Sequence, residues 1–470
     1  MYAKLKKITG HTGQDAMLVI VSVLLLIVSA VTGIPIVKKG FGFLALLTLS
    51  YIALRNRLKE ILVFLAIFIP YREVLDLYSG GWVKAVPDVL VALLFLRLLW
   101  EKKGRLKFNR IDFAYFFFLL IALASHFLNQ RPFLAYVIEL RSIVLYYLLY
   151  FILRQQEIKK ETVLTVFRTS IAVSSLVVFC GIVEKITAKR LLFPEQWMER
   201  LISNSNFPRV YSLLNNPNTF AAYLLMVLVL FYYVYKQGWL RERKKWYFGV
   251  AALAGCGIWL SMSRSAFLAL VVFVGVTYFL FRDRKDIVFW GKIVGGGLVV
   301  YLIVLGVAKL FMLLVRTYGG TESSLFHRFQ RMLTRKEVEE SIRGGRIFYF
   351  LTGLKVVKDY PLIGAGFGTY GDAAAFMLGS PLSSKYGLPK KFYADNEYIK
   401  VLVETGLLGM GAYLHWLYRV LKDNYDRGIK VALTLAVVFL GLFYNIWEVQ
   451  AVTFYYWLLL ALPGRREIEA

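Results

Sequence analysis

The sequence predicts an all-α integral membrane protein, a polytopic bundle of about 12–14 transmembrane helices with one large extracytoplasmic loop. Three observations support this fold class. Of the 470 residues, 58% are hydrophobic and only 19% are charged, which is too apolar for the surface of a soluble protein. Apolar runs long enough to cross a bilayer recur almost from end to end. The segments between them are alternately rich and poor in lysine and arginine.

Each apolar run of roughly 20 residues, or a shorter one that tilts or pairs with a neighbour, is interpreted as a span. The expected spans are 16–36, 41–55, 60–71, 85–100, 111–128, 132–153, 162–184, 217–236, 247–263, 264–281, 288–314, 396–420, 430–446 and 449–463. The first run has no small-residue cleavage signal, so we expect it to be retained as an anchor. The runs on either side of Arg55-Asn56-Arg57 and the last pair are short and could be re-entrant.

The basic residues are concentrated in the loops that are expected on one side of the membrane. Lysines precede the first run, and every second loop after it is basic, which places both termini in the cytoplasm by the positive-inside rule. The net charge of +27, from 57 basic and 30 acidic residues, is therefore a topology signal and an attraction to anionic membrane lipids. Nucleic acid is not an expected partner. The chain divides into N-terminal helices, central helices, a large outer loop and C-terminal helices, at 1–184, 185–314, 315–395 and 396–470.

The large outer loop contains a helical pattern of apolar residues that should lie on the membrane surface: Ile347, Phe350, Leu351, Leu354 and Val357. It also contains Gly364-Ala365-Gly366-Phe367-Gly368. Because this run lacks a Walker lysine, we interpret it as a tight turn that packs the loop against the membrane domain.

Three arginines at the outer boundary are the main candidates for chemistry, namely Arg209, Arg264 and Arg346. Arg264 lies between two apolar runs, so its side chain either snorkels to lipid headgroups or meets an anion in a polar cavity. With the hydroxyls of Ser263 and Ser265, its planar guanidinium suits a diphosphate.

Two Asn-rich sites precede expected spans. Asn215-Asn216-Pro217-Asn218 is either a helix N-terminus alone or an anion site beside Arg209. Asp395-Asn396-Glu397-Tyr398 offers Asp395 either as a helix cap or as a general base, and Glu404 is expected to be hydrogen-bonded within the bundle.

Other titratable residues favour structure over chemistry. Glu139 and Arg141 are interpreted as buried charges that pair with other helices. Both cysteines lie in apolar runs and the four histidines are scattered, so the sequence predicts no disulfide framework, no metal site and no cofactor.

The outer motifs occur in a fixed order: Arg209 with Asn215-Asn216-Pro217-Asn218, then Ser263-Arg264-Ser265, then Gly345-Arg346 with Asp359-Tyr360-Pro361 and the glycine run, then Asp395-Asn396-Glu397-Tyr398. This series resembles the O-antigen ligase/polymerase family over roughly residues 200–410. The resemblance implies a metal-independent, inverting glycosyltransferase of the GT-C type, acting at the outer face of the bacterial cytoplasmic membrane. Its donor would be an undecaprenyl-diphosphate-linked glycan, and its acceptor a lipid-linked oligosaccharide or a lipid A core.

Site roles follow from the same resemblance. Arg209, Arg264 and Arg346 would hold the lipid diphosphate, and Asp395 occupies the position of the family's histidine base. The candidates for substrate binding are Asn215, Asn218, Ser263, Ser265, Asn396, Glu397, Tyr398 and Arg343. Glu397 is the reserve candidate for the base. Polymerase ranks slightly above ligase, which would transfer a finished glycan to a lipid A core or a protein. A lipid-linked glycan flippase stays open as an alternative of another class, although its charges should line a path at the bilayer midplane.

Overall fold

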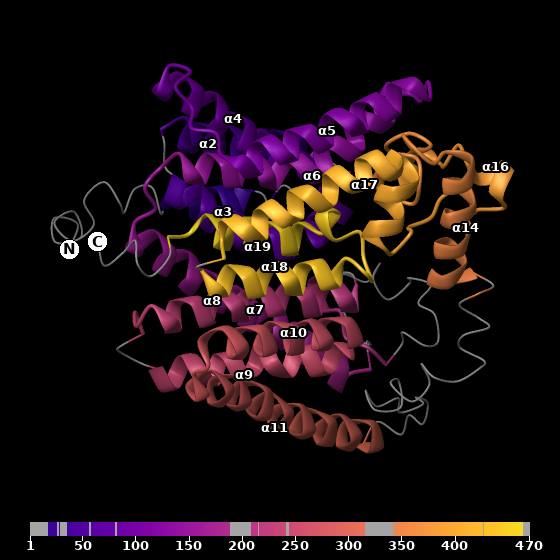
Figure 1. Ribbon diagram of the computed structural model, residues 1–470. Helices are drawn as coiled ribbons and strands as arrows, with labels where there is room; N and C mark the ends of the chain where they lie inside the picture. Colours follow the sequence, from indigo (N-terminus) through magenta and orange to yellow (C-terminus); the bar gives the residue numbers. More distant parts are fainter. Residues whose placement is uncertain are drawn as a thin grey trace. The chain divides into compact units, whose positions relative to one another are not determined.

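The computed structural model describes residues 17–25, 28, 35–55, 58–79, 82–188, 208–214, 216–240, 244–314, 342, 344–425 and 427–463. Over these residues the regular structure is helical and no strand occurs, which confirms the predicted fold class (Figure 1). The chain forms two compact units that interleave along the sequence. The first unit takes its residues from Met1–Leu106, Leu148–Met262 and Lys292–Thr321, and the second from Lys107–Tyr147, Ser263–Gly291 and Glu322–Ala470.

The first unit contains the early helices and the central ones. Its elements are α2 (Pro35–Leu54), α3 (Leu58–Ser79), η1 (Trp82–Ala85), α4 (Val86–Lys102), α7 (Lys160–Ile186), η3 (Ser212–Leu214), α8 (Pro217–Lys236), α9 (Lys244–Ser261) and most of α11 (Arg284–Leu314). α8 is apolar around its whole circumference and is buried from Phe220 to Val234. Such a helix is stable only when neighbours cover every face, and α7 and α9 both pack against it.

The second unit contains the outer loop and the C-terminal helices. Its elements are α5 (Arg110–Leu128), the first part of α6 (Phe133–Arg154), α10 (Arg264–Phe281), α14 (Arg346–Asp359), α15 (Ala373–Leu378), α16 (Ser383–Tyr386), α17 (Glu397–Asp423), α18 (Gly428–Leu440), η4 (Ile446–Glu448) and α19 (Gln450–Ala461). α17 packs along α5, and α10 packs along α18 (Figure 1).

Six of the described helices are long and apolar enough to cross a membrane: α5, α6, α7, α8, α10 and α11. The expected total of 12–14 spans stays a prediction. α18 has 13 residues and α19 has 12. At 1.5 Å per residue each covers about 20 Å, less than the roughly 30 Å of a hydrocarbon core. The last pair of expected spans is thus two short helices joined by an irregular segment at 441–449, as their short apolar runs suggested.

The glycine run crosses α17 at close range. Gly364 and Gly406 both have positive φ, of 76° and 64°, and α17 is kinked at Gly406. The backbone N–H of Ala365 donates to Val403 O at 2.8 Å, and that of Leu407 donates to Pro361 O at 2.9 Å. At the end of α5, the Asn129 amide donates to Gly364 O at 3.0 Å. The predicted tight turn, which packs the outer loop on the membrane helices, is therefore confirmed.

The amphipathic pattern in the loop forms helix α14, as predicted. Its inner side is narrow, with Thr352, Gly353 and Val356 buried against α17. Much of the predicted apolar face is exposed instead, with 37–46% of the surface of Ile347, Phe350, Leu351 and Leu354 accessible. An exposed apolar face suits contact with a membrane surface, and that placement stays a prediction.

Candidate active site

The N-terminus of α17 separates the roles of two adjacent residues. Asn396 is the helix cap, because its side-chain Oδ1 accepts from the backbone N–H of Tyr398 at 3.1 Å and of Ile399 at 3.0 Å. Its amide donates to Leu442 O at 3.1 Å. Asp395 therefore does not cap the helix. It has a φ of +50°, in the left-handed region that aspartate tolerates better than most residues.

The carboxylate of Asp395 faces Arg346 at the start of α14. Arg346 Nε lies 3.5 Å from Asp395 Oδ2, and the two side chains are 42% and 48% exposed. Partial burial raises the pKa of the Asp395 carboxyl above its ordinary value, and the guanidinium of Arg346 opposes that rise. Asp395 is thus a carboxylate with increased basicity that solvent and a ligand can reach.

Tyr444 links this pair to the Ser-Arg-Ser motif. The guanidinium of Arg346 lies 5.9 Å from the centre of the Tyr444 ring, and the Tyr444 hydroxyl hydrogen-bonds to Ser265 Oγ. Ser265 Oγ in turn lies 3.3 Å from Ser263 Oγ. These serines flank Arg264, the first residue of α10. The second unit therefore brings three of the four predicted motifs into one chain of contacts.

Tyr444 is the residue of this site that sequence reasoning missed. It lies in the irregular segment between α18 and α19. The sequence predicted one continuous span over 430–446, which would place Tyr444 inside a membrane helix. The shortness of the apolar run before Tyr444-Asn445 was the only available signal.

The fourth motif is built within the first unit. Arg209 is buried, with its Nε donating to Ser261 O at 2.9 Å and its terminal amine hydrogen-bonding to Asn218 Oδ1. Asn216 caps α8 through its side-chain oxygen, which accepts from the Asn218 backbone N–H at 2.8 Å. The backbone here is fixed by Glu184, which accepts from the N–H of Ser212 at 2.7 Å. The predicted helix N-terminus is confirmed and lies beside Arg209, and an anion site there stays a prediction.

The remaining predicted residues have other surroundings. Glu397 is buried and pairs with Lys400 at 3.1 Å, and the Tyr398 hydroxyl donates to Val438 O. Both side chains therefore bind within the helical bundle. Asn215 and Arg343 lie outside the described residues.

Residues 248–414 match the family model Wzy_C, described as O-Antigen ligase. This segment, about a third of the chain, is similar to that family. The matched segment includes Ser263-Arg264-Ser265, Arg346, Asp395 and most of α17, whereas Arg209 and Tyr444 lie outside it. Members of that family carry out glycan transfer of the O-antigen ligase/polymerase type. No curated protein shows significant similarity to the chain.

A buried charge network lies beneath the start of α17. Lys400 Nζ lies 3.0 Å from Glu139 on α6, 3.1 Å from Glu397 and 2.9 Å from Glu448. The expectation that Glu139 pairs with another helix is confirmed, whereas Arg141 is exposed rather than buried. Glu139 and Arg141 lie on different sides of α6, because residues two positions apart are separated by about 200° around a helix. Lys400 was not singled out, although a lysine in an apolar run was a usable signal.

Two further carboxyl groups, those of Asp372 and Glu404, meet Glu139 next to this network. Oxygens of Glu139, Asp372 and Glu404 lie within 4.8 Å of one another, and they form the one acidic group among the described residues with spacing that could hold a metal ion. Glu404 Oε1 accepts from the backbone N–H groups of Thr369 and Tyr370, both at 2.9 Å, so it is hydrogen-bonded within the protein as expected. Burial and the neighbouring Glu404 raise the pKa of Asp372. These acids secure the outer loop to α17 and are assigned no chemical step.

Proposed function

We propose that the chain is a metal-independent inverting glycosyltransferase at the outer face of the bacterial cytoplasmic membrane, which uses an undecaprenyl-diphosphate-linked glycan as donor. One observation carries the proposal: an accessible carboxylate, Asp395, faces Arg346, and Tyr444 joins that pair to the serines around Arg264. A base and cationic groups that suit a diphosphate therefore lie within one chain of contacts in a single unit of the fold.

The arginines would bind the donor and stabilise the leaving group. A guanidinium presents its N–H donors in a planar fork that matches phosphate oxygens, and its charge does not depend on pH in the working range. Arg264 and Arg346 would take this role in the second unit, with Ser263 and Ser265 as neutral donors. Family resemblance gives Arg209 the same role, with Asn218 fixing its guanidinium.

Asp395 would act as the general base. Its carboxylate accepts the proton of an acceptor sugar hydroxyl while that oxygen forms a bond to the anomeric carbon. The bond between the anomeric carbon and the phosphate oxygen breaks, and its electron pair leaves with undecaprenyl diphosphate. Attack opposite the leaving group inverts the anomeric configuration. The developing negative charge falls on oxygens that the arginines contact.

The identity of the acceptor distinguishes a polymerase from a ligase. We rank a lipid-linked oligosaccharide, and hence polymerisation, slightly above transfer to a lipid A core. The description of the matched family as O-Antigen ligase keeps the ligase as the second candidate.

Purified full-length protein supplied with a lipid-diphosphate donor tests the proposal. In the presence of EDTA, and with each acceptor in a separate reaction, we expect a glycan product whose new linkage is inverted relative to the donor, as read by NMR. Retained configuration, or activity abolished by EDTA and restored by a divalent cation, would contradict the proposed chemistry. A product with only one of the two acceptors would identify the polymerase or the ligase.

A further inference from the structure

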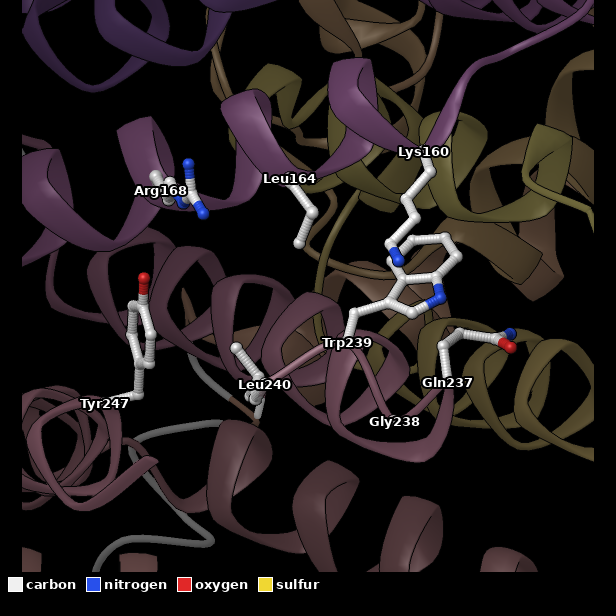
Figure 2. Close-up of a pocket in the computed structure, with 8 residues that line it drawn as sticks. All are labelled: Lys160, Leu164, Arg168, Gln237, Gly238, Trp239, Leu240 and Tyr247. Carbon is white, nitrogen blue, oxygen red and sulfur yellow. The ribbon is translucent and has the colours of Figure 1, made fainter. Parts of the chain in front are cut away.

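A basic cavity lies in the first unit, at one end of three apolar helices. Its volume is about 520 Å³, and it is lined by residues at the start of α7, just after α8 and at the start of α9 (Figure 2). The lining residues are Lys160, Leu164, Arg168, Gln237, Gly238, Trp239, Leu240 and Tyr247.

The cavity presents positive charge and hydrogen-bond donors from two sides. Lys160, Leu164 and Arg168 are spaced four residues apart and project from the same face of α7, as Figure 2 shows. Trp239 and Tyr247 lie on the facing side, with the Tyr247 hydroxyl directed toward Arg168. Among the described residues that line the cavity, none is acidic. A bound group with negative charge would therefore meet two cations there.

These donors are not used within the described part of the protein. Lys160 Nζ lies 5.6 Å from the centre of the Trp239 ring, which is the one interaction of its side chain with the described residues. The side chains of Arg168, Gln237 and Tyr247 make no hydrogen bond or ion pair to any described residue. An ammonium, a guanidinium, an amide and a phenol thus face one space, a set of donors that suits the oxygens of a phosphate.

The position of the cavity separates it from the proposed donor site. Arg209 and Asn218 lie near the C-terminal end of α7 and the N-terminal end of α8, where Glu184 holds the backbone of Ser212. The cavity lies at the opposite ends of the same helices. α7 has 27 residues and is about 40 Å long, and about 24 Å of it separates Arg168 of the cavity from Glu184. A helix of this length can cross the roughly 30 Å of a hydrocarbon core, and the positive-inside rule predicts that the two regions face opposite leaflets.

We propose that this cavity binds the phosphate of an anionic phospholipid headgroup in the cytoplasmic leaflet. The ends of apolar helices α7 and α8 place it at the depth of lipid headgroups, where tryptophan is also favoured. The positive-inside distribution of lysine and arginine assigns this end to the cytoplasm, where anionic lipids bind basic pockets between helices. The inference is independent of the proposed transferase activity.

Lipid binding to the delipidated full-length protein tests the proposal. Native mass spectrometry with phosphatidylglycerol, phosphatidylcholine and inorganic phosphate as separate probes would give the affinity of each. We expect saturable binding of phosphatidylglycerol that phosphatidylcholine does not match. The double substitution Lys160→Gln/Arg168→Gln should weaken phosphatidylglycerol binding about 10- to 30-fold, since each basic side chain near an anionic headgroup contributes roughly a fivefold preference.

The matched control removes the same charge elsewhere in the first unit. Lys102 and Arg105 are exposed at the end of α4, and Lys102→Gln/Arg105→Gln should change phosphatidylglycerol binding by less than about twofold. Equal losses in the two double variants would show that general surface charge attracts the lipid, and would overturn the proposal. So would equal affinity for phosphatidylcholine, or inorganic phosphate binding as tightly as the lipid, which would indicate a site for free phosphate.

Discussion

Arg346 Nε lies 3.5 Å from Asp395 Oδ2, so the first residue of α14 and the residue before the cap of α17 form an ion pair. The distance is longer than the roughly 2.7–2.9 Å of a close charge-assisted hydrogen bond, and both side chains are about half exposed. An exposed pair of this kind contributes only about 0–1 kcal/mol to stability. The pair is therefore better explained by what it offers a ligand, a positive charge on Arg346 and a proton acceptor on Asp395, than by its effect on stability.

Replacement of Asp395 should remove the base and leave the binding of donor largely intact. Asparagine preserves the shape of the side chain but cannot accept the proton, so Asp395→Asn should lower kcat by about 10²–10⁴-fold, the usual contribution of a general base. Asp395→His should retain measurable activity, because imidazole is also a base. Steady-state kinetics with a fixed acceptor check this. Normal turnover of Asp395→Asn with an inactive Glu397→Gln would move the assignment to Glu397.

The pH dependence of transfer should respond to Arg346. Activity requires the ionised Asp395, so it is present above the pKa of that carboxyl and falls as pH falls through it. Partial burial raises this pKa and Arg346 opposes the rise. Arg346→Gln removes the opposing charge, so the acidic limb of kcat/KM should move to higher pH. Lys358→Gln, an equal change at the far, exposed end of α14, should leave the limb in place. An unmoved limb in Arg346→Gln would separate Arg346 from the base.

Arg264 should be required for transfer and not for folding. Arg264→Ala removes the guanidinium at the start of α10, which we expect to cost on the order of 2–5 kcal/mol of transition-state stabilisation. Arg264→Lys should not restore activity, because a point charge cannot form two parallel bonds to a diphosphate. Arg209→Ala should behave like Arg264→Ala. Arg282→Ala at the exposed opposite end of α10 is the control, and near-normal turnover of Arg264→Ala would remove this residue from the mechanism.

Two glycines of α17 should respond oppositely to alanine. Gly406 has a φ of 64°, and a Cβ there would lie 2.4 Å from the backbone carbon of Leu362. Gly406→Ala should therefore lower stability by about 1–3 kcal/mol or more. Gly411 lies in the same helix, and a Cβ there would meet no other atom within 4 Å, so Gly411→Ala should raise stability by up to about 1 kcal/mol. Thermal unfolding in detergent measures both. Equal effects of the two substitutions on stability would contradict the close contact between residues 362–364 and α17 at Gly406.

The membrane orientation can be checked by cysteine labelling. Ser384 in the outer loop and Lys245 at the start of α9 are both exposed. In a chain whose Cys180 and Cys256 are replaced by alanine, Ser384→Cys should react with an impermeant maleimide in intact cells. Lys245→Cys should react only after the membrane is permeabilised, as the positive-inside rule predicts. The reverse pattern would overturn the topology and the proposed location of the site.

The class of fold and the approximate positions of the helices could be predicted from the amino-acid sequence. Apolar runs of spanning length have few alternatives in lipid, because every backbone polar group must be satisfied within the membrane segment. The order of the outer motifs also indicated the resemblance to the O-antigen ligase/polymerase family, and residues 248–414 match the O-antigen ligase family model. Even the turn at Gly364-Ala365-Gly366 was predictable, since only glycine tolerates such backbone geometry at little cost.

Which polar residues contact one another could not be predicted, because those contacts depend on how the helices pack. Asp395 and Asn396 are equally good caps by sequence, and the hydrogen bonds of Asn396 to the first turn of α17 leave Asp395 to Arg346. Tyr444 and Lys400 gain their roles from partners more than 45 positions away, at Ser265 and Glu448 among others. Such pairings depend on how helices pack and where they break. Hydrophobic periodicity specifies which face of a helix is buried, but not which polar side chain of another helix lies opposite it.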